Sequence, residues 1–229
     1  MNRLDRVMSN LGYCSRKEVG KLIRQGRLTV DGKPPASAAV KVDPATVRLD
    51  EQPLDPAPPL VLLLNKPAGY ACSHDDHPPL VYSLLPERYG RRKPKLSSVG
   101  RLDKDTTGVL VVTDDGQLLH RLTSPKHKVE KVYQVKTRDP LSEEDLGMLT
   151  SGELELDGSR LLPARASLRA PNHLELVLVE GRFHQVKRML ELLGNQVVDL
   201  HRSAFGGLEL EGLAEGEFRR LETLPAHWG

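Results

Sequence analysis

Apolar positions near the N-terminus recur at helical spacing before the pattern changes to short extended runs. The first helix is predicted by four apolar residues: Leu4, Val7, Met8 and Leu11. A second helix is predicted to begin at Ser15 as its N-cap, with Glu18 completing a capping box, and to end at Gly26. Residues 28–30 and 40–49 then have the character of strands. The first fifty residues therefore predict two packed helices followed by a small sheet.

Residues 51–59 contain four prolines, which fix φ and remove backbone donors. Regular structure is not expected there, so this segment is predicted to be a linker. The domain organisation that follows is a small N-terminal domain at residues 1–50, a linker at 51–59 and a larger domain at 60–229.

The larger domain alternates between apolar runs and amphipathic stretches. Strands are predicted at residues 60–65, 109–113, 131–136, 164–168 and 174–179, and helices at residues 117–122, 142–149 and 184–193. Strands outnumber helices, and no regular strand–helix–strand alternation is present. The pattern favours an α+β domain with a mainly antiparallel mixed sheet flanked by helices and loops, rather than a doubly wound parallel sheet.

The composition of the chain argues against a disulfide-rich protein, a metal site and a membrane protein. The two cysteines, Cys14 and Cys72, match no zinc or redox spacing, which argues against a disulfide framework or a thiolate metal site. The His74–His77 cluster has no ligand partners at a defined spacing, so no metal is expected there. No apolar stretch approaches the roughly 20 residues of a membrane helix, and residues 1–5 lack a secretion signal. We therefore expect a cytoplasmic protein without a membrane partner.

The net charge of +2 conceals an uneven distribution. Residues 1–50 hold ten Lys or Arg and five Asp or Glu, giving +5 and leaving −3 for the remainder. A basic domain without a hydrophobic insertion face favours a nucleic acid over a membrane as the partner. A solvated charged surface is the alternative.

The segment Gly100–Gly108 places charged residues immediately before the buried run 109–112. Catalytic groups often lie on loops that a rigid strand holds, so Asp103 and Arg101 are candidates for a site at the rim of the sheet. Seven cations lie in or just upstream of this loop: Arg88, Arg91, Arg92, Lys93, Lys95, Arg101 and Lys104. Asp103 and Asp105 together are compatible with glycosidic-bond hydrolysis, although Asp105 is better explained as a loop support.

The segment 181–188 follows an apolar strand and opens a helix, so its polar side chains project from a rigid junction. Helix N-termini favour anions. Ordinary helix surface charge is the alternative explanation for Lys187 and Arg188.

Three segments together resemble the signature motifs of the RsuA and RluB/E/F family of ribosomal RNA pseudouridine synthases: residues 100–108, 130–135 and 180–189. The N-terminal helix pair, with Arg3-Leu4-Asp5, Ser15-Arg16 and Val30-Asp31-Gly32, resembles an S4 RNA-binding domain. The resemblance spans nearly the whole chain and implies an S4-like domain joined to a pseudouridine synthase domain. It also implies an isomerase that needs no cofactor.

Within this family the chain resembles the small-subunit branch more than the large-subunit branches. The residues that carry this likeness are 105–108, 113–117, 120–121 and 123–125. It implies uridine 516 of 16S rRNA as the target, in a small-subunit assembly intermediate, and a monomeric enzyme. A large-subunit (23S) rRNA synthase of the same family, a non-catalytic rRNA-binding assembly protein and an N-ribosyl hydrolase remain alternatives.

The resemblance assigns the chemistry to three residues. Asp103 is implied to attack ribose C1′ as a nucleophile or to remove the C2′ proton, and the sequence leaves both routes open. Lys187 is implied to pair with Asp103. Tyr133 is implied to stack on the uracil ring or to take part in removing the C5 proton, whereas packing in the core is its alternative role.

The remaining site residues are expected to bind RNA. Arg101 is expected to fill the space left by a flipped-out uridine or to hold a neighbouring phosphate. The S4-like surface is expected to use Arg3, Arg16, Arg24 and Arg27, and the larger domain Arg182, His184 and Arg188.

Overall fold

The computed structural model describes residues 1–228, which form two compact units. The first unit comprises residues 1–61, 82–97 and 113–116, and the second comprises residues 62–81, 98–112 and the rest of the described chain. The first unit thus includes two segments from beyond residue 60. The limits at residues 50 and 59 stay predictions. Within residues 1–228, none of the helices has the length and apolar character needed to cross a membrane.

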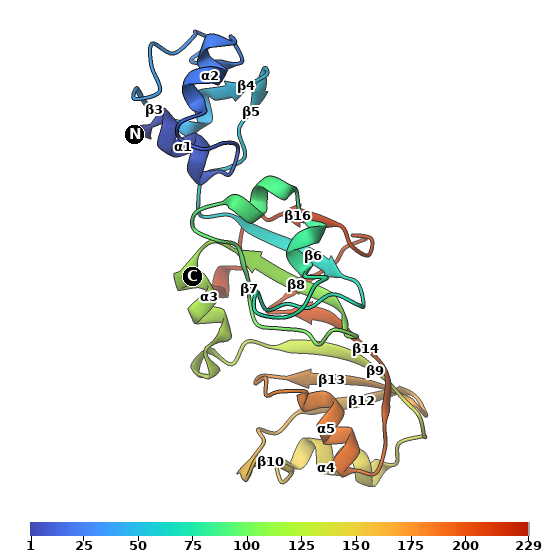
Figure 1. The fold of residues 1–229 in the computed structure, drawn as a ribbon. Coiled ribbons are helices and arrows are strands. Elements are labelled where there is room, and N and C mark those ends of the chain that lie inside the picture. The colour runs from blue at the N-terminus through green and yellow to red at the C-terminus, as the bar shows by residue number, and fades with distance from the viewer. Residues whose placement is uncertain (229) are drawn as a thin grey trace. The chain divides into compact units, whose positions relative to one another are not determined.

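The first unit begins with two short helices, α1 (Leu4–Asn10) and α2 (Val19–Arg24). A three-stranded antiparallel sheet follows, formed by β2 (Leu28–Val30), β4 (Val47–Leu49) and β5 (Gln52–Pro53), while β1 (Asn2–Arg3) pairs with β3 (Lys41–Val42). Its core contains the predicted apolar face of the first helix, packed against the second helix and the strands. Figure 1 shows this helix pair and sheet in blue and light blue.

Three local predictions for this unit were wrong. The second helix begins at Val19 rather than next to Ser15, and the Glu18 carboxylate accepts a hydrogen bond from the Ser15 backbone N–H at 2.7 Å. A 3-10 turn at Pro44–Thr46 interrupts the predicted strand 40–49. The proline-rich segment is also not fully irregular, because Gln52–Pro53 pairs with β4. Pro53 has no N–H to donate, which suits the outer position of β5 in this sheet.

A buried ion pair holds the end of the proline-rich segment in the first unit. Arg92 Nη2 donates to the Asp114 carboxylate at 3.1 Å and to the Pro56 carbonyl at 2.9 Å. The other carboxylate oxygen of Asp114 accepts from the Leu60 N–H at 2.7 Å. Both charged side chains are fully buried, so each charge is neutralised by its partner.

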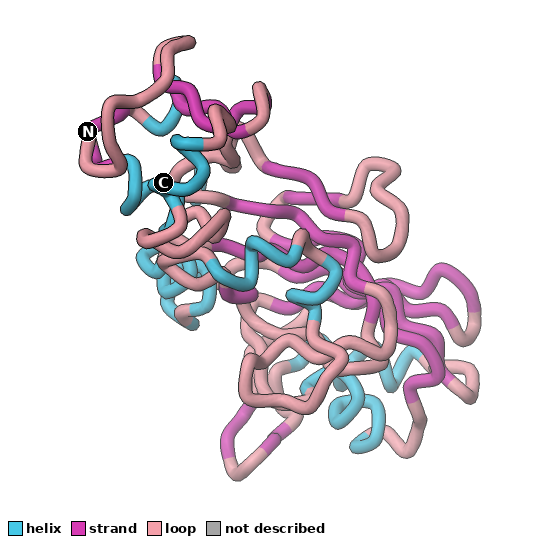
Figure 2. Tube along the Cα trace, turned by 45° about the horizontal axis from the view of Figure 1, so that its top comes forward, coloured by secondary structure: helices cyan, strands magenta, loops and turns pink. Residues whose placement is uncertain are grey.

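A nine-stranded mixed sheet dominates the second unit (Figure 2, magenta). The main path runs β12 (Arg165–Ala170), β13 (His173–Leu178), β9 (Lys131–Thr137), β14 (Val197–Phe205), β8 (Thr107–Thr113), β6 (Val61–Lys66) and β16 (Phe218–Arg220). Two short strands join it: β7 (Ser97–Ser98) beside β8 and β15 (Leu208–Glu209) beside β14. The β14–β8 pair is parallel, whereas the pairs from β12 to β14 and the β16–β6 pair are antiparallel. The predicted α+β class with a mainly antiparallel sheet is confirmed.

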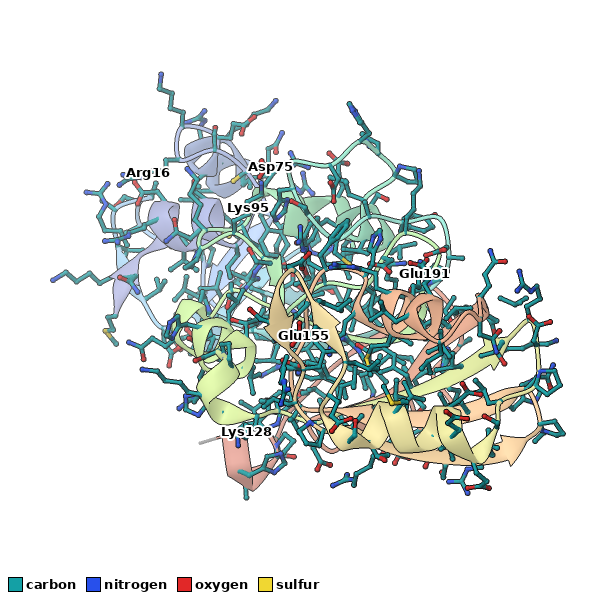
Figure 3. The ribbon with its side chains drawn as sticks, turned by 90° about the horizontal axis from the view of Figure 1, so that it is seen from below. Arg16, Asp75, Lys95, Lys128, Glu155 and Glu191 are labelled. Carbon is teal, nitrogen blue, oxygen red and sulfur yellow. The ribbon has the colours of Figure 1, made fainter. Side chains whose placement is uncertain are left out.

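The helices flank this sheet, and a small hairpin stands apart from it. They are α3 (Gly116–Thr123), α4 (Glu143–Ser151) and α5 (Gln185–Leu192), each within two residues of its predicted limits. The hairpin pairs β10 (Glu155–Leu156) with β11 (Ser159–Arg160). Figure 3 labels Glu155 on this hairpin and Glu191 on α5.

The strand β14 was not predicted, although it lies in the middle of the sheet. Its sequence mixes Asp199, His201 and Arg202 with apolar residues and shows no clear alternation. It approaches β8 very closely at Gly108, which has φ +106°, and a Cβ there would lie 2.2 Å from the Arg202 carbonyl oxygen. Gly108 therefore allows the parallel pairing on which the site depends.

Candidate active site

A cavity of about 630 Å³ in the second unit is lined by five of the seven site residues predicted in that unit. Its lining comes from the loop before β8, from β9 and β14, and from the junction between β13 and α5. Predicted site residues that line it are Arg101, Asp103, Tyr133, Arg182 and His184. This volume suits a small ligand or a single nucleoside.

Asp103 lies at this cavity with two basic side chains beside it. Lys187 Nζ is 3.2 Å from Asp103 Oδ2, and His184 Nε2 is 3.5 Å from Oδ1. The side chain of Asp103 is 25% exposed, so solvent or a substrate can reach it. His184 and Lys187 lie 81 and 84 positions after Asp103 in the sequence, and folding brings both to its carboxylate.

Lys187 bridges two carboxylates rather than one. Its Nζ donates to Asp105 Oδ1 at 2.6 Å, closer than its contact with Asp103. Burial alone would lower the pKa of Lys187, but the hydrogen bonds to both carboxylates outweigh it and the pKa is raised. Burial would raise the pKa of Asp105, yet the bond from Lys187 leaves it lowered. Both partners are therefore charged at neutral pH, and the contact between Lys187 and Asp105 was not predicted from the sequence.

A buried lysine holds the loop that carries Asp103. Lys66, at the end of β6, is 0% exposed, and its Nζ donates to the carbonyls of Lys104 at 3.2 Å and Thr106 at 2.7 Å. The Gly69 N–H donates to the same Lys104 carbonyl at 2.7 Å. Burial lowers the pKa of Lys66. No role was predicted for Lys66 from the sequence, because nothing in its spacing signals that it would hold the aspartate loop.

His184 has an unusual backbone conformation at the other side of Asp103. Its φ of +50° is left-handed, and it caps α5 without a side-chain hydrogen bond to the helix. Gln185 holds the preceding turn, because its Oε1 accepts from the Arg182 N–H at 2.8 Å and its Nε2 donates to Glu180 at 2.9 Å. Left-handed conformations of non-glycine residues cluster at functional sites.

Tyr133 lies on β9 opposite Arg202 of β14 and is 9% exposed. Lys131, Leu178, Leu200 and Phe205 also line the cavity. The cavity therefore offers an apolar and aromatic wall together with a carboxylate, which suits the flat ring of a nucleobase.

Comparison with known proteins identifies the family of the chain. The family model for RNA pseudouridylate synthases matches residues 60–192, and the S4 domain model matches residues 2–47. The chain belongs to the RNA pseudouridine synthase family. It is accordingly an isomerase, as the resemblance implied.

Similar proteins span almost the whole synthase. The ribosomal small subunit pseudouridine synthase A of Yersinia pestis is 42% identical, with 96% of this chain and 95% of the relative covered. An uncharacterized RNA pseudouridine synthase of Bacillus subtilis is 39% identical, with 98% and 97% covered. A crystal structure of a pseudouridylate synthase matches with a TM-score of 0.67 and 36% identity, covering 96% of each chain.

Two arginines of the synthase that were predicted to bind RNA are held by the protein itself. The Arg182 guanidinium donates to the carbonyls of Leu156 at 2.9 Å, Ser159 at 3.1 Å and Arg160 at 2.6 Å. The Arg188 guanidinium donates two hydrogen bonds to the Asp157 carboxylate, from Nη1 at 2.9 Å and from Nη2 at 2.7 Å. These bonds tie α5 and its N-terminal junction to the β10–β11 hairpin and use donors that a phosphate contact would need.

The predicted RNA-binding arginines of the S4 domain differ in their surroundings. Arg3 and Arg16 both contact Asp5, and Arg27 pairs with Asp50. Arg24 makes no ion pair with any described residue. All four lie in the first unit, and their RNA contacts stay predictions.

The His74–His77 cluster does not form a metal site in residues 1–228. No group of three or more His, Cys, Asp or Glu side chains within that range is arranged to hold a metal ion. Instead, the Asp76 carboxylate accepts from the Ser73 N–H at 3.2 Å within the loop.

Proposed function

We propose that this synthase converts a uridine of small-subunit ribosomal RNA to pseudouridine, with uridine 516 of 16S rRNA as the target. The relative from Yersinia pestis is named a ribosomal small subunit pseudouridine synthase, and the two proteins align over nearly their full lengths. The +5 charge of residues 1–50 and the S4 match support an RNA partner. The observation that carries the proposed chemistry is the Asp103 carboxylate held by Lys187 at the cavity.

Asp103 starts the reaction by one of two routes. As a nucleophile, its carboxylate oxygen bonds to ribose C1′ while the bond from C1′ to uracil N1 breaks, and the electron pair leaves with uracil. As a base, it takes the C2′ proton while the same C1′–N1 bond breaks, leaving a glycal. Uracil then turns and C5 bonds to C1′. In the first route the bond from Asp103 to C1′ breaks and its electron pair returns to the carboxylate, whereas in the second route the Asp103 carboxyl returns its proton to C2′. In both routes the C5 proton is then lost and N1 gains a proton. Bonds and charges balance without a cofactor or water as reactant.

Lys187 and Tyr133 support these steps in different ways. The ammonium group of Lys187 orients the Asp103 carboxylate, and its raised pKa keeps it protonated at neutral pH. Tyr133 lines the cavity, where its ring can stack on uracil and its hydroxyl is a candidate for removing the C5 proton.

RNA binding has to offset the cost of extracting the target base. Flipping a nucleotide costs a few kcal/mol. Arg101 lines the cavity and is exposed, so it is suited to occupy the vacated stack or to hold a neighbouring phosphate. The S4 arginines supply further phosphate contacts, which release counterions and make binding sensitive to salt.

The test measures tritium released from C5-labelled uridine in 16S transcript and in small-subunit assembly intermediates. Wild-type protein is expected to release tritium and to form pseudouridine at position 516, whereas Asp103→Asn is expected to release none above background. Asp105→Asn provides the matched comparison, because it removes the other carboxylate on Lys187 and should retain release if a single acid performs the chemistry.

Each result has a distinct meaning. An absence of tritium release by wild type on both substrates, or equal release by Asp103→Asn, contradicts the proposal. Free uracil as the product indicates a hydrolase instead. Modification of 23S rRNA alone indicates a large-subunit target. Deuterium at C2′ separates the two routes, since only proton removal there gives a primary isotope effect.

A further inference from the structure

Two cations in the cavity wall, one buried and one half-buried, have no part in the reaction described so far. Lys131 on β9 and Arg202 on β14 both line the cavity. They are linked by one aromatic ring, because the Arg202 guanidinium lies 5.0 Å and Lys131 Nζ 5.8 Å from the centre of Phe205. The register of the two strands explains this grouping, since Lys131 lies opposite Phe205 and Tyr133 opposite Arg202.

Arg202 is buried without a counter-charge. It is 1% exposed, its Nε donates to the Val109 carbonyl at 2.8 Å, and its Nη2 has no hydrogen-bond partner. No carboxylate of the described residues lies within ion-pair distance of it. A buried charge of this kind is costly and calls for an explanation.

Lys131 is half-buried and also lacks an ion-pair partner among the described residues. Its Nζ donates to the Val129 carbonyl at 2.7 Å and contacts no carboxylate in the part of the chain that the structure describes. Burial, together with the charge of Arg202, lowers its pKa to about 8. Glu180 opposes this shift, but the Glu180 carboxylate already accepts hydrogen bonds from the Leu162 N–H and the Gln185 side chain. The charge of Lys131 thus costs stability, and no carboxylate among residues 1–228 forms an ion pair with it.

The proposed reaction creates a negative charge in this cavity. When C1′–N1 breaks by either route, uracil departs as an anion whose charge spreads over N1, O2 and O4. A half-turn about the N3–C6 axis then brings C5 to C1′ and exchanges the positions of O2 and O4. A wall with two cations can stabilise the anion both before and after this turn.

We propose that Lys131 and Arg202 form a cationic wall that stabilises the uracil anion between cleavage of the C1′–N1 bond and formation of the C1′–C5 bond. This inference rests on the proposed function and extends it to the fate of the leaving base. Hydrogen bonds to the Val129 and Val109 carbonyls hold both cations in place in the free protein, so little reorganisation is needed when the negative charge develops. These two cations lower the stability of the free enzyme, because neither has an ion-pair partner among the described residues.

The decisive experiment compares uridine with 5-fluorouridine at the target position of the same RNA. Fluorine withdraws electrons and stabilises the uracil anion, so cleavage depends less on the protein's cations. Lys131→Met is expected to lower the single-turnover loss of uridine about 10²-fold and the loss of 5-fluorouridine about 10-fold or less. Lys131→Arg keeps the charge and should restore most of both rates.

Controls separate this role from a structural one. Lys136→Met removes an exposed lysine from the same strand and should leave both rates unchanged. Lys131→Met should also raise the melting temperature, because it removes a charge that burial disfavours. If Lys131→Met does not fold, Lys131→Gln, which retains a donor for the Val129 carbonyl, provides the same comparison of substrates.

The outcomes distinguish the two proposals. If wild type consumes neither nucleotide, the proposed function fails. If wild type is active and Lys131→Met slows both substrates by the same factor, or slows neither, the cationic wall is overturned while the proposed function stands. A larger loss on uridine than on 5-fluorouridine supports the wall.

Discussion

Two buried arginines, one in each unit, show how differently the molecule uses a charge. Arg92 in the first unit is 2% exposed and faces Asp114, which is also buried. Arg202 in the second unit is 1% exposed and lines the cavity without a carboxylate at ion-pair distance among residues 1–228. Both guanidinium groups have nitrogens without hydrogen-bond partners, so missing partners alone do not separate them. The counter-charge separates them, because Arg92 has Asp114 as its partner and Arg202 has no carboxylate at ion-pair distance among residues 1–228.

This difference separates a structural charge from one available for chemistry. The Arg92–Asp114 pair is neutral and fastens the proline-rich segment through Pro56 and Leu60. Arg202 and Lys131 have no carboxylate at ion-pair distance among the described residues, and in our proposal their charge meets the negative charge that the reaction develops. Removing Arg92 should therefore reduce stability, whereas removing a charge at the cavity should reduce activity.

The largest expected effect is on stability, from Arg92→Met. The substitution leaves Asp114 buried without its partner, which is expected to cost about 3–5 kcal/mol of unfolding free energy. Urea unfolding measures the loss, and tritium release per folded molecule should stay at the wild-type level. Arg91→Met is the control, because Arg91 pairs with Glu87 on the surface and should change stability by less than about 1 kcal/mol. If Arg92→Met has the unfolding free energy of wild type, the pairing with Asp114 does not stabilise the protein, and the contrast between Arg92 and Arg202 is wrong.

The next effect is on catalysis, from Lys187→Met. Loss of the ammonium group beside Asp103 is expected to lower the single-turnover rate about 10²-fold, with Lys187→Arg recovering part of it. Arg188→Met, one residue away and paired with Asp157 at the surface, provides the control and should change the rate little. A similar loss of rate for both variants would mean that α5 matters only as a structural support.

A smaller effect is expected for RNA binding through Arg24. Filter-binding titrations at several salt concentrations should show Arg24→Gln weakening the RNA complex and reducing the slope of log K against log salt by about 1. Arg27→Gln should change the slope less, because Arg27 already pairs with Asp50. Equal changes for the two variants would show that ion pairing within the S4 domain does not limit its RNA contacts.

The smallest expected effect is on the pH dependence of stability, from Asp105→Asn. The pKa of Asp105 is lowered in the folded protein, so its contribution to stability is present above the ordinary aspartate pKa and is lost as pH falls through the lowered value. The raised pKa of Lys187 keeps that contribution intact on the alkaline side until the lysine deprotonates. Because Asp105 is 72% exposed, the difference in unfolding free energy at pH 7 should be below about 1 kcal/mol. Urea unfolding near pH 7 and near pH 2 should show this difference disappearing in acid. A constant difference would exclude the ion pair as its source.

The elements of the second unit were largely predictable from local pattern. The alternating run 131–136 became β9, and the amphipathic run 184–193 became α5 within one residue at each end. In both cases one face is apolar at the period of its element, and burial of that face is what stabilises it. The short second helix of the first unit was less predictable, because local capping competes there with tertiary packing.

The site was predicted in part. Asp103 was identified from its position before a buried strand and from the family resemblance, and the structure places it at the cavity with Lys187 beside it. Lys66 and Arg202 were missed because nothing in the spacing of either residue signals that its charged side chain is buried. Arg182 was predicted as an RNA contact, but its guanidinium donates to three backbone carbonyls.

By itself the sequence determined the α+β class, the basic N-terminal domain and the family, and it singled out the aspartate that we propose as the reactive group. These follow from short-range periodicity, composition and ordered motifs, all of which are read along the chain. The tertiary structure alone decided which charges are neutralised: Lys187 bridges Asp103 and Asp105, Arg92 meets Asp114, and Arg202 meets no acid among the described residues. The reason is physical, since the strength of a charge depends on its burial and on partners that folding brings from distant positions.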